Sequence, residues 1–338
     1  MIHQITINDF FNDQKDFTVI DVRSEIEFSV GHIKGALNIP ILTNDERRIV
    51  GTTYKQNGRQ PAVFKGLDLS GPHLGERLKK GIKSIKTDKV LVHCWRGGMR
   101  SEFYSFLLHY YGLDPYMLIG GYKSYRQLVH VSFDRPLSFV ILSGKTGSGK
   151  TELLQHLMDK GEQVIDLEFL AKHRGSSFGA LAFEEPTTQE QFENDLFEVI
   201  RHFDPEKRIW IEDESRTIGD KVIPEGIWKQ MALASRVVIE KSFDERLERI
   251  VKDYGVFNKE DLKRSMLRIG KRLGPQHVKA ALEFLDVNDQ HSAFAIALAY
   301  YDKAYTYQLS SFDHAKSNVI DAEGLESDLL VKRLMNYE

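Results

Sequence analysis

The feature that most constrains the fold is a glycine-rich stretch at residues 144–151, with the sequence GKTGSGKT. It follows an apolar run typical of a buried strand and precedes a run with helical spacing. This arrangement matches the Walker A pattern, in which glycines curl the loop around phosphates and the lysine reaches the terminal ones. A glycine turn with only a structural role is the alternative. The predicted phosphate-binding residues are Gly144, Lys145, Thr146, Gly147, Ser148, Gly149, Lys150 and Thr151.

A second apolar run with acidic residues at its end is predicted to lie near this loop. Residues 209–215 read IWIEDES, so that a strand ends in Glu212 and Asp213. Either carboxylate is a candidate ligand for Mg²⁺, together with the Thr151 hydroxyl. A solvated strand end is the alternative, and Mg²⁺ is therefore a candidate cofactor.

A third run, residues 164–168 (VIDLE), leads into a basic loop punctuated by glycines. In open α/β sheets the carboxyl ends of the strands meet at the ligand site. We therefore expect Asp166, His173 and Arg174 to contribute a second site for an anionic group. A histidine and an arginine that are simply solvated would give the same pattern.

The only cysteine of the chain, Cys94, ends an apolar run and begins a basic loop, residues 94–101 (CWRGGMRS). Loop N–H groups, a helix N-terminus and nearby arginines all stabilise a thiolate, which is the reactive form of cysteine. A lone cysteine is more often a buried core residue, but these flanking residues favour a reactive one. The candidate catalytic residues are Cys94, Arg96 and Arg100.

Length and periodicity predict two α/β domains, since 338 residues exceed one typical domain. Short apolar runs such as residues 90–93 alternate with helical patterns, which predicts a mostly parallel sheet covered by helices. Residues 44–84, rich in glycine and polar side chains, are expected to form a long excursion over the surface. The predicted domains are residues 1–135 and residues 136–338.

The composition favours a cytoplasmic protein. A single cysteine excludes an internal disulfide framework and fits a reducing compartment. The first residues show no basic segment followed by an apolar one, so no signal peptide is expected. No apolar run approaches the roughly 18 residues of a membrane span, and we expect no membrane partner.

The net charge of −3 means that any contact with nucleic acid must come from a local basic patch. Such a patch is predicted within a helical region of about residues 245–310, because residues 262–282 contain six basic side chains and no acidic one. Helical spacing there turns Leu262, Met266, Ile269 and Leu273 to the core. A solvated helix face is the alternative to RNA contact. The predicted RNA-binding residues are Lys263, Arg264, Arg268, Lys271 and Arg272.

Three segments in order resemble the signature of rhodanese domains, over roughly residues 1–135. They are residues 21–23 (DVR), residues 27–28 (EF) and residues 31–40 (GHIKGALNIP), and the Cys94 loop follows downstream, about as far along the chain as in that family. The resemblance implies a cysteine that carries a transferable sulfur or selenium. Trp95 and the glycine pair after Arg96 depart from the commonest composition of this loop, which argues against ordinary transfer from thiosulfate to cyanide.

Nearly the whole chain resembles the tRNA 2-selenouridine synthase family, in which a rhodanese domain precedes a P-loop domain. The resemblance rests on the Cys94 loop, on residues 144–151 and on residues 166–179. It implies a transferase that replaces sulfur by selenium in wobble 2-thiouridine of tRNA, with selenophosphate as donor. It also implies an S-geranylated intermediate made from geranyl diphosphate. The enzyme that produces selenophosphate is a further candidate partner.

The geranyl step has a chemical reason. An S-alkylated sulfur departs from carbon as a thiol and is a better leaving group than a thiocarbonyl sulfur. The loop, Lys150 and Mg²⁺ would neutralise the leaving diphosphate. Whether the loop binds ATP, geranyl diphosphate or both stays open, as does whether Cys94 carries selenium covalently. Two other functions remain: a P-loop kinase or ATPase regulated by a rhodanese domain, and a relay protein that passes persulfide sulfur to a partner.

Overall fold

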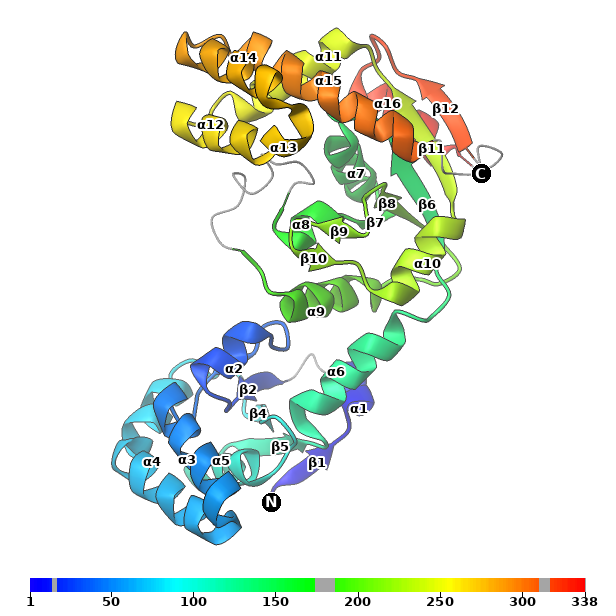
Figure 1. The fold of residues 1–338 in the computed structure, drawn as a ribbon. Coiled ribbons are helices and arrows are strands. Elements are labelled where there is room, and N and C mark those ends of the chain that lie inside the picture. The colour runs from blue at the N-terminus through cyan, green and yellow to red at the C-terminus, as the bar shows by residue number, and fades with distance from the viewer. Residues whose placement is uncertain (14–16, 174–185, 310–316, 338) are drawn as a thin grey trace. The chain divides into compact units, whose positions relative to one another are not determined.

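The computed structural model describes residues 1–13, 17–173, 186–309 and 317–337, and it divides into two compact units. Unit 1 contains Met1–Ser132 and also Glu193–Glu198, which is the middle of helix α9 (Gln189–Ile200). Unit 2 contains the remaining residues, Phe133–Phe192 and Val199–Glu338. The sequence does not predict the assignment of Glu193–Glu198 to unit 1. Figure 1 shows the elements of both units.

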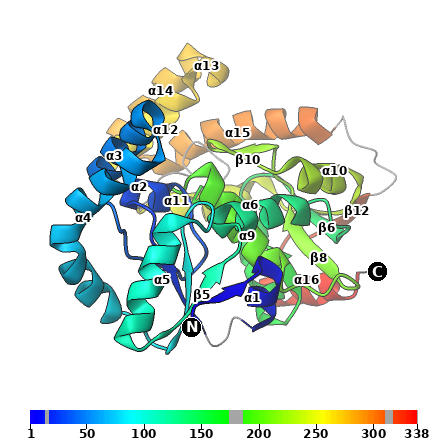
Figure 2. The same cartoon turned by 90° about the horizontal axis from the view of Figure 1, so that it is seen from below.

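Unit 1 is built on a five-stranded parallel sheet with the strand order β1-β5-β4-β2-β3. Its central strand β4 is apolar between Lys89 and His93 because helices cover both faces of such a sheet, and Val90, Leu91 and Val92 are fully buried. Helix α5 lies beside β5 (Figure 2). The strands are β1 (His3–Ile5), β2 (Thr18–Asp21), β3 (Leu37–Asn38), β4 (Lys89–His93) and β5 (Asp114–Leu118). The helices are α1 (Ile7–Asp13), α2 (Glu25–Val30), α3 (Asn44–Asn57), α4 (Arg59–Ile82), α5 (Met99–Tyr111) and α6 (Gly121–Ser132).

The expected surface excursion at residues 44–84 consists of two helices packed on each other, α3 and α4. Helix α3 begins at a capping box, in which Thr43 and Glu46 satisfy each other's backbone N–H groups. Helix α4 continues through Pro72 and buries few of its residues. The segment therefore lies largely on the surface, but it is regular where its glycine content suggested otherwise.

Unit 2 contains a second five-stranded parallel sheet, with the order β12-β11-β6-β8-β7. Strand β6, which leads into the Walker A loop, is central, and its Leu142 is paired with Glu212 of β8. The acidic end of β8 therefore lies beside the start of the loop, as the sequence predicted. The strands are β6 (Ser138–Ser143), β7 (Gln163–Ile165), β8 (Arg208–Glu212), β11 (Ser235–Glu240) and β12 (Ser317–Asp321), with a separate antiparallel pair of β9 (Thr217–Ile218) and β10 (Lys221–Val222).

The helices of unit 2 include a C-terminal group with a core of its own. Leu262, Met266, Ile269 and Leu273 are all buried in it, as their spacing predicted. The chain is thus mixed α/β with two parallel sheets and a helical C-terminal part, which confirms the predicted fold class. No described helix combines the length and the apolar character needed to cross a bilayer. The helices besides α9 are α7 (Lys150–Asp159), α8 (Leu167–Ala171), α10 (Glu225–Leu233), α11 (Phe243–Tyr254), α12 (Lys259–Arg268), α13 (Gly270–Leu273), α14 (Pro275–Asp286), α15 (Gln290–Leu309) and α16 (Ser327–Met335).

Candidate functional site

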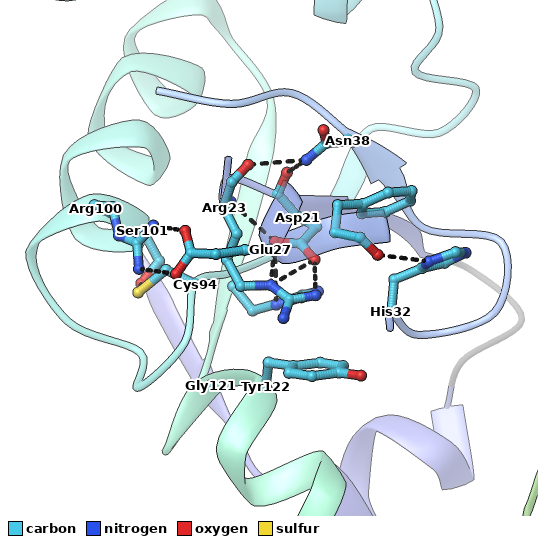
Figure 3. Close-up of polar contacts among 12 residues, drawn as sticks. Asp21, Arg23, Glu27, His32, Asn38, Cys94, Arg100, Ser101, Gly121 and Tyr122 are labelled. Carbon is cyan, nitrogen blue, oxygen red and sulfur yellow. Dashed lines mark hydrogen bonds and ion pairs between the residues drawn. The ribbon is translucent and has the colours of Figure 1, made fainter. Parts of the chain in front are cut away.

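The Cys94 loop of unit 1 connects β4 to the N-terminus of α5 (Figure 3). The side chain of Cys94 is 4% exposed, and its Sγ accepts a hydrogen bond from the N–H of Gly98 at 3.4 Å. The Oγ of Ser101 also lies 3.4 Å from Sγ. The sulfur thus lies at the start of a helix, where backbone N–H groups without intrahelical partners favour negative charge.

These surroundings favour the thiolate of Cys94. Burial alone raises the pKa of this thiol, but the Ser101 hydroxyl, the positive charge of Arg100 and the backbone N–H of Gly98 together bring it below its usual value. Arg100 is fixed by an ion pair with Glu27, whose Oε2 lies 2.7 Å from its Nη1 (Figure 3). Arg96 is exposed and makes no hydrogen bond or ion pair within the described part of the chain. Arg100 therefore acts on the sulfur, whereas Arg96 faces solvent.

The loop packs directly on the start of α6, and glycine is required where the two backbones meet. The N–H of Tyr122 donates to the carbonyl of Cys94 at 2.8 Å. At Gly121, where φ is +60°, a Cβ would lie 2.3 Å from the nitrogen of Gly97 and 2.4 Å from the carbonyl oxygen of Cys94. The sequence analysis did not select Gly121, because nothing local to it signals this contact.

The Asp21 and Arg23 side chains of the rhodanese signature form a buried pair near this loop. Arg23 Nε donates to Asp21 Oδ2 at 2.9 Å, and the Arg23 guanidinium lies 3.7 Å from the ring centroid of Tyr122 (Figure 3). Burial opposes the charge of Asp21, but His93 and Arg23 outweigh it and lower the pKa of Asp21. The pair holds β2 and α6 together, which gives these signature residues a structural role.

In unit 2 the Walker A loop curls between β6 and α7, with Gly147 at φ +84° and Gly149 at φ +89°. Lys150 lies at the first position of α7, and its Nζ donates to the carbonyl of Gly144 at 2.8 Å. A buried arginine of α11, Arg246, donates to the carbonyl of Thr146 at 3.1 Å and so fixes the outer part of the loop. Loop N–H groups and a helix N-terminus of this kind form an anion site.

A cluster of three carboxylates lies beside this loop. Ligand atoms of Glu168, Glu212 and Glu214 lie within 4.8 Å of one another, and the Thr151 hydroxyl donates to Glu168 Oε2 at 3.4 Å. Burial, followed by repulsion from Glu168, raises the pKa of Glu212 well above its usual value and that of Glu214 to about 8. Such crowding is relieved when a divalent cation binds, and oxygen ligands are those that Mg²⁺ prefers.

The donor set therefore fits Mg²⁺, but its members differ from the predicted ones. Thr151 and Glu212 are brought together, whereas Asp213 accepts a hydrogen bond from the Ser143 hydroxyl instead. The sequence analysis did not select Glu168 or Glu214, although each lies at the acidic end of a predicted strand. Which carboxylates hold a metal stays a prediction.

The loop and the carboxylates line a cavity of about 610 Å³, within the size range of small-molecule sites. Its other side is formed by residues of α11 and α15, namely Arg249, Ile250, Asp253, Tyr254, Tyr301 and Tyr305. Of the predicted second anion site, Asp166 lines this cavity and caps α8 through the N–H of Phe169. His173 packs its ring against Gly219, and Arg174 lies outside the described residues.

Two basic side chains of the predicted RNA-binding stripe form ion pairs with acidic residues of the protein itself. Lys263 is ion-paired with Asp286, and Arg264 with Asp261, so that acidic residues outside the run supply the missing counter-charges. Arg268 is exposed at the end of α12. The side chains of Lys271 and Arg272 lie outside the described residues. RNA binding by this stripe stays a prediction.

Comparison with protein-family models and with known proteins gives matches over most of the chain. A model of the tRNA 2-selenouridine synthase AAA domain matches residues 137–327, more than half of the chain. A tRNA 2-selenouridine synthase of Aeromonas salmonicida is 33% identical over 332 residues, which cover 88% of each protein. The chain belongs to the tRNA 2-selenouridine synthase family. The resemblance inferred from the motifs is thereby confirmed, and a rhodanese-like domain model matches residues 7–128.

A second tRNA 2-selenouridine synthase, from Nitrosomonas eutropha, is 37% identical over 250 residues. That match covers 71% of this chain and 63% of the relative, so it spans less than two thirds of the relative's length. Among solved structures, the N-terminal domain of a putative ATP/GTP binding protein from Clostridium difficile is 36% identical. It covers 37% of this selenouridine synthase family member and 97% of the solved domain, with a TM-score of 0.35.

Proposed function

We propose that this family member replaces sulfur by selenium in wobble 2-thiouridine of tRNA, through an S-geranylated intermediate. The observation that carries the proposal is the composition of the unit 2 cavity, in which the anion-binding loop is followed by Ile250 and the rings of Tyr254 and Tyr301, with Arg249 and Asp253 beside them. A prenyl diphosphate has the same two parts, a doubly ionised head and a hydrocarbon tail. Membership of the selenouridine synthase family supplies the tRNA substrate.

The first step forms a carbon–sulfur bond on the nucleoside. The thiocarbonyl sulfur attacks the first carbon of geranyl diphosphate, the carbon–oxygen bond breaks, diphosphate leaves and the ring nitrogen loses its proton. Lys150 and the loop N–H groups stabilise the charge on the leaving diphosphate. Bound at Glu168, Glu212 and Glu214, Mg²⁺ would neutralise further phosphate charge there.

The second step replaces the geranylated sulfur. Selenium from selenophosphate bonds to the activated carbon, geranyl thiol leaves with a proton, and water cleaves the phosphorus–selenium bond to release phosphate. One selenophosphate is consumed for each nucleoside, so the enzyme that makes selenophosphate is a proposed partner. The reaction is proposed to take place in the cytoplasm.

Electron balance restricts what Cys94 does in that step. Selenium in selenophosphate is already fully reduced, so forming a sulfur–selenium bond on the cysteine would require an oxidant or release phosphite. Attack of the Cys94 thiolate on the activated carbon requires neither, because it expels geranyl thiol and is itself displaced by selenium. The lowered pKa of Cys94 supports this role by making more thiolate available near neutral pH.

The test is incubation of the full chain with thiolated tRNA, geranyl diphosphate and selenophosphate, followed by mass spectrometry of the nucleosides. Cys94→Ser is expected to accumulate geranylthiouridine without selenouridine, since no second cysteine can substitute. Lys150→Ala is expected to lose the geranylated nucleoside first.

Wild-type selenouridine from Cys94→Ser would contradict the assignment of the cysteine. ATP hydrolysis that depends on Lys150, without any geranyl transfer, would instead favour the kinase or ATPase function. Labelled sulfur on Cys94 with no RNA product would favour the sulfur relay.

A further inference from the structure

Two helices of unit 2, α11 and α15, pack against each other (Figure 1), and residues of both line the cavity. Near the Walker A loop, Arg246 of α11 forms a bidentate ion pair with Asp302 of α15, at 2.8 and 2.7 Å. About two turns further along α11, the ring of Tyr254 lies 6.4 Å from that of Phe294, which is correspondingly earlier in α15. The two contacts fix the relative direction of the helices and therefore give the wall of the cavity a near end and a far end.

The near end is polar and in contact with the loop. Arg246 donates to the carbonyl of Thr146, and the guanidinium carbon of Arg249 lies 3.0 Å from the position a Cβ would take on Gly149. From α15, the Tyr305 hydroxyl hydrogen-bonds to Ser143 at 2.7 Å. An anion held by the loop therefore meets cationic and hydroxyl groups at this end.

With distance from the loop the wall gains aliphatic and aromatic side chains, although Asp253 also lines it beside Tyr254. Ile250 lies one turn beyond Arg246 on α11, Tyr301 lies one turn before Tyr305 on α15, and both line the cavity. Tyr254 follows on α11, at about 12 Å from Arg246 along the helix at 1.5 Å per residue. It is the lining residue of α11 furthest from the loop contacts.

We propose that the ring of Tyr254 forms the end wall of the tail site and sets the length of the prenyl chain that the site accepts. This inference rests on the proposed use of a prenyl diphosphate and names the residue that selects among such substrates. The chain of geranyl diphosphate lies along Ile250 and Tyr301 and ends at Tyr254. A chain longer by one isoprene unit meets the ring.

The ring can act as a stop because the core behind it is closed. It packs against Phe294, which is 1% exposed, and against Phe257, with ring centroids 6.4 and 6.3 Å away. A longer chain can therefore extend only if the ring is removed, since close-packed cores do not yield to an inserted group without strain.

In the experiment, the full chain and thiolated tRNA are incubated with an equimolar mixture of dimethylallyl, geranyl and farnesyl diphosphates. The prenylated nucleosides are then compared by mass spectrometry. Tyr254→Ala is expected to raise the farnesyl-to-geranyl ratio of kcat/KM by about tenfold or more, as one added or removed methylene already changes selectivity about tenfold. Tyr254→Phe, which keeps the ring, is expected to retain the wild-type preference.

The matched control is Tyr300→Ala, since Tyr300 packs on the same helical core but does not line the cavity. It is expected to keep the wild-type ratio, and circular dichroism checks that each variant is folded. If Tyr254→Ala is not folded, Tyr254→Leu, which shortens the side chain while staying apolar, replaces it in the same assay.

An unchanged ratio in a folded Tyr254 variant, with geranylation intact in the wild type, would overturn this inference and leave the proposed function standing. A wild-type chain that transfers no prenyl group, but binds ATP more weakly after Tyr254→Ala, would instead overturn both. The tyrosine would then hold a nucleoside.

Discussion

Replacing Gly121 by alanine tests whether the contact between α6 and the Cys94 loop sets the reactivity of the cysteine. The new Cβ would lie 2.3 Å from the nitrogen of Gly97 and 2.4 Å from the carbonyl oxygen of Cys94, both backbone atoms that cannot rotate away. The left-handed backbone at φ +60° costs about 1–2 kcal/mol for alanine. Overpacking adds about 1–3 kcal/mol, so the free energy of unfolding of unit 1 should fall by about 2–5 kcal/mol.

Gly112→Ala is the matched control within the same unit. Gly112 also has a positive φ, of +103°, but a Cβ there would meet nothing within 4 Å. Its cost should therefore be the backbone strain alone, about 1–2 kcal/mol. The difference between the two variants isolates the clash with the loop.

The assay uses the fact that Cys94 is the only cysteine and is buried in unit 1. Its alkylation in increasing urea reports the unfolding of unit 1, and its alkylation rate against pH in native buffer reports the pKa of the thiol. In Gly121→Ala the loop moves away from α6 and its N–H groups from the sulfur, so the pKa of Cys94 should rise. The reasoning is refuted if Gly121→Ala costs no more than Gly112→Ala and leaves the pH profile unchanged.

Arg100→Met should also move the alkylation profile of Cys94 to higher pH, because the thiolate loses a nearby positive charge; a profile that stays in place would show that hydrogen bonds alone lower the pKa. The pKa of Glu214 is raised to about 8, so this carboxyl is protonated at neutral pH in the folded protein. The stability of metal-free unit 2 should therefore fall as the pH rises from about 4.3, the pKa of a glutamate in the unfolded chain, to 8. The thermal shift caused by Mg²⁺ should grow over the same pH range. Glu214→Gln should remove most of this pH dependence. Arg268→Glu should weaken tRNA binding and reduce its log–log salt slope by about 0.7–0.9 per phosphate contact; an unchanged slope in a salt titration would indicate a solvated helix end.

The parts predicted from sequence are those whose signals are contiguous. The strand, glycine loop and helix at residues 144–151 lie next to one another in the chain, and the Cys94 loop has the same local form. Parallel strands buried on both faces read as apolar runs, so the fold class follows from them. The glycine content of residues 44–84 suggested an irregular segment, but these residues form two helices, because tertiary packing between α3 and α4 overrides weak helix propensity.

What the sequence did not predict depends on contacts between distant residues. Gly121 matters because it meets the backbone of Gly97, and Glu168 because it meets Glu212 and Glu214. The ion pair of Lys263 with Asp286 also depends on such a contact, since the charge pattern of α12 does not predict which acidic residues of α14 pack beside it. Such contacts require the register of the sheet or the packing of helices, which no local pattern encodes.

The contacts of α15 with the Walker A loop determine when, during synthesis, the anion site can be completed. Ser143 lies at the end of the strand that enters the loop, but its hydroxyl partner Tyr305 follows 162 residues later. At about 5–20 residues per second, a ribosome needs roughly 8–30 s to add that stretch. During that interval buried Arg246, once made, has no Asp302 to pair with, so the nascent loop lacks the support that α15 gives it. The proposed binding of a prenyl diphosphate should therefore become possible only after α15 has been synthesised.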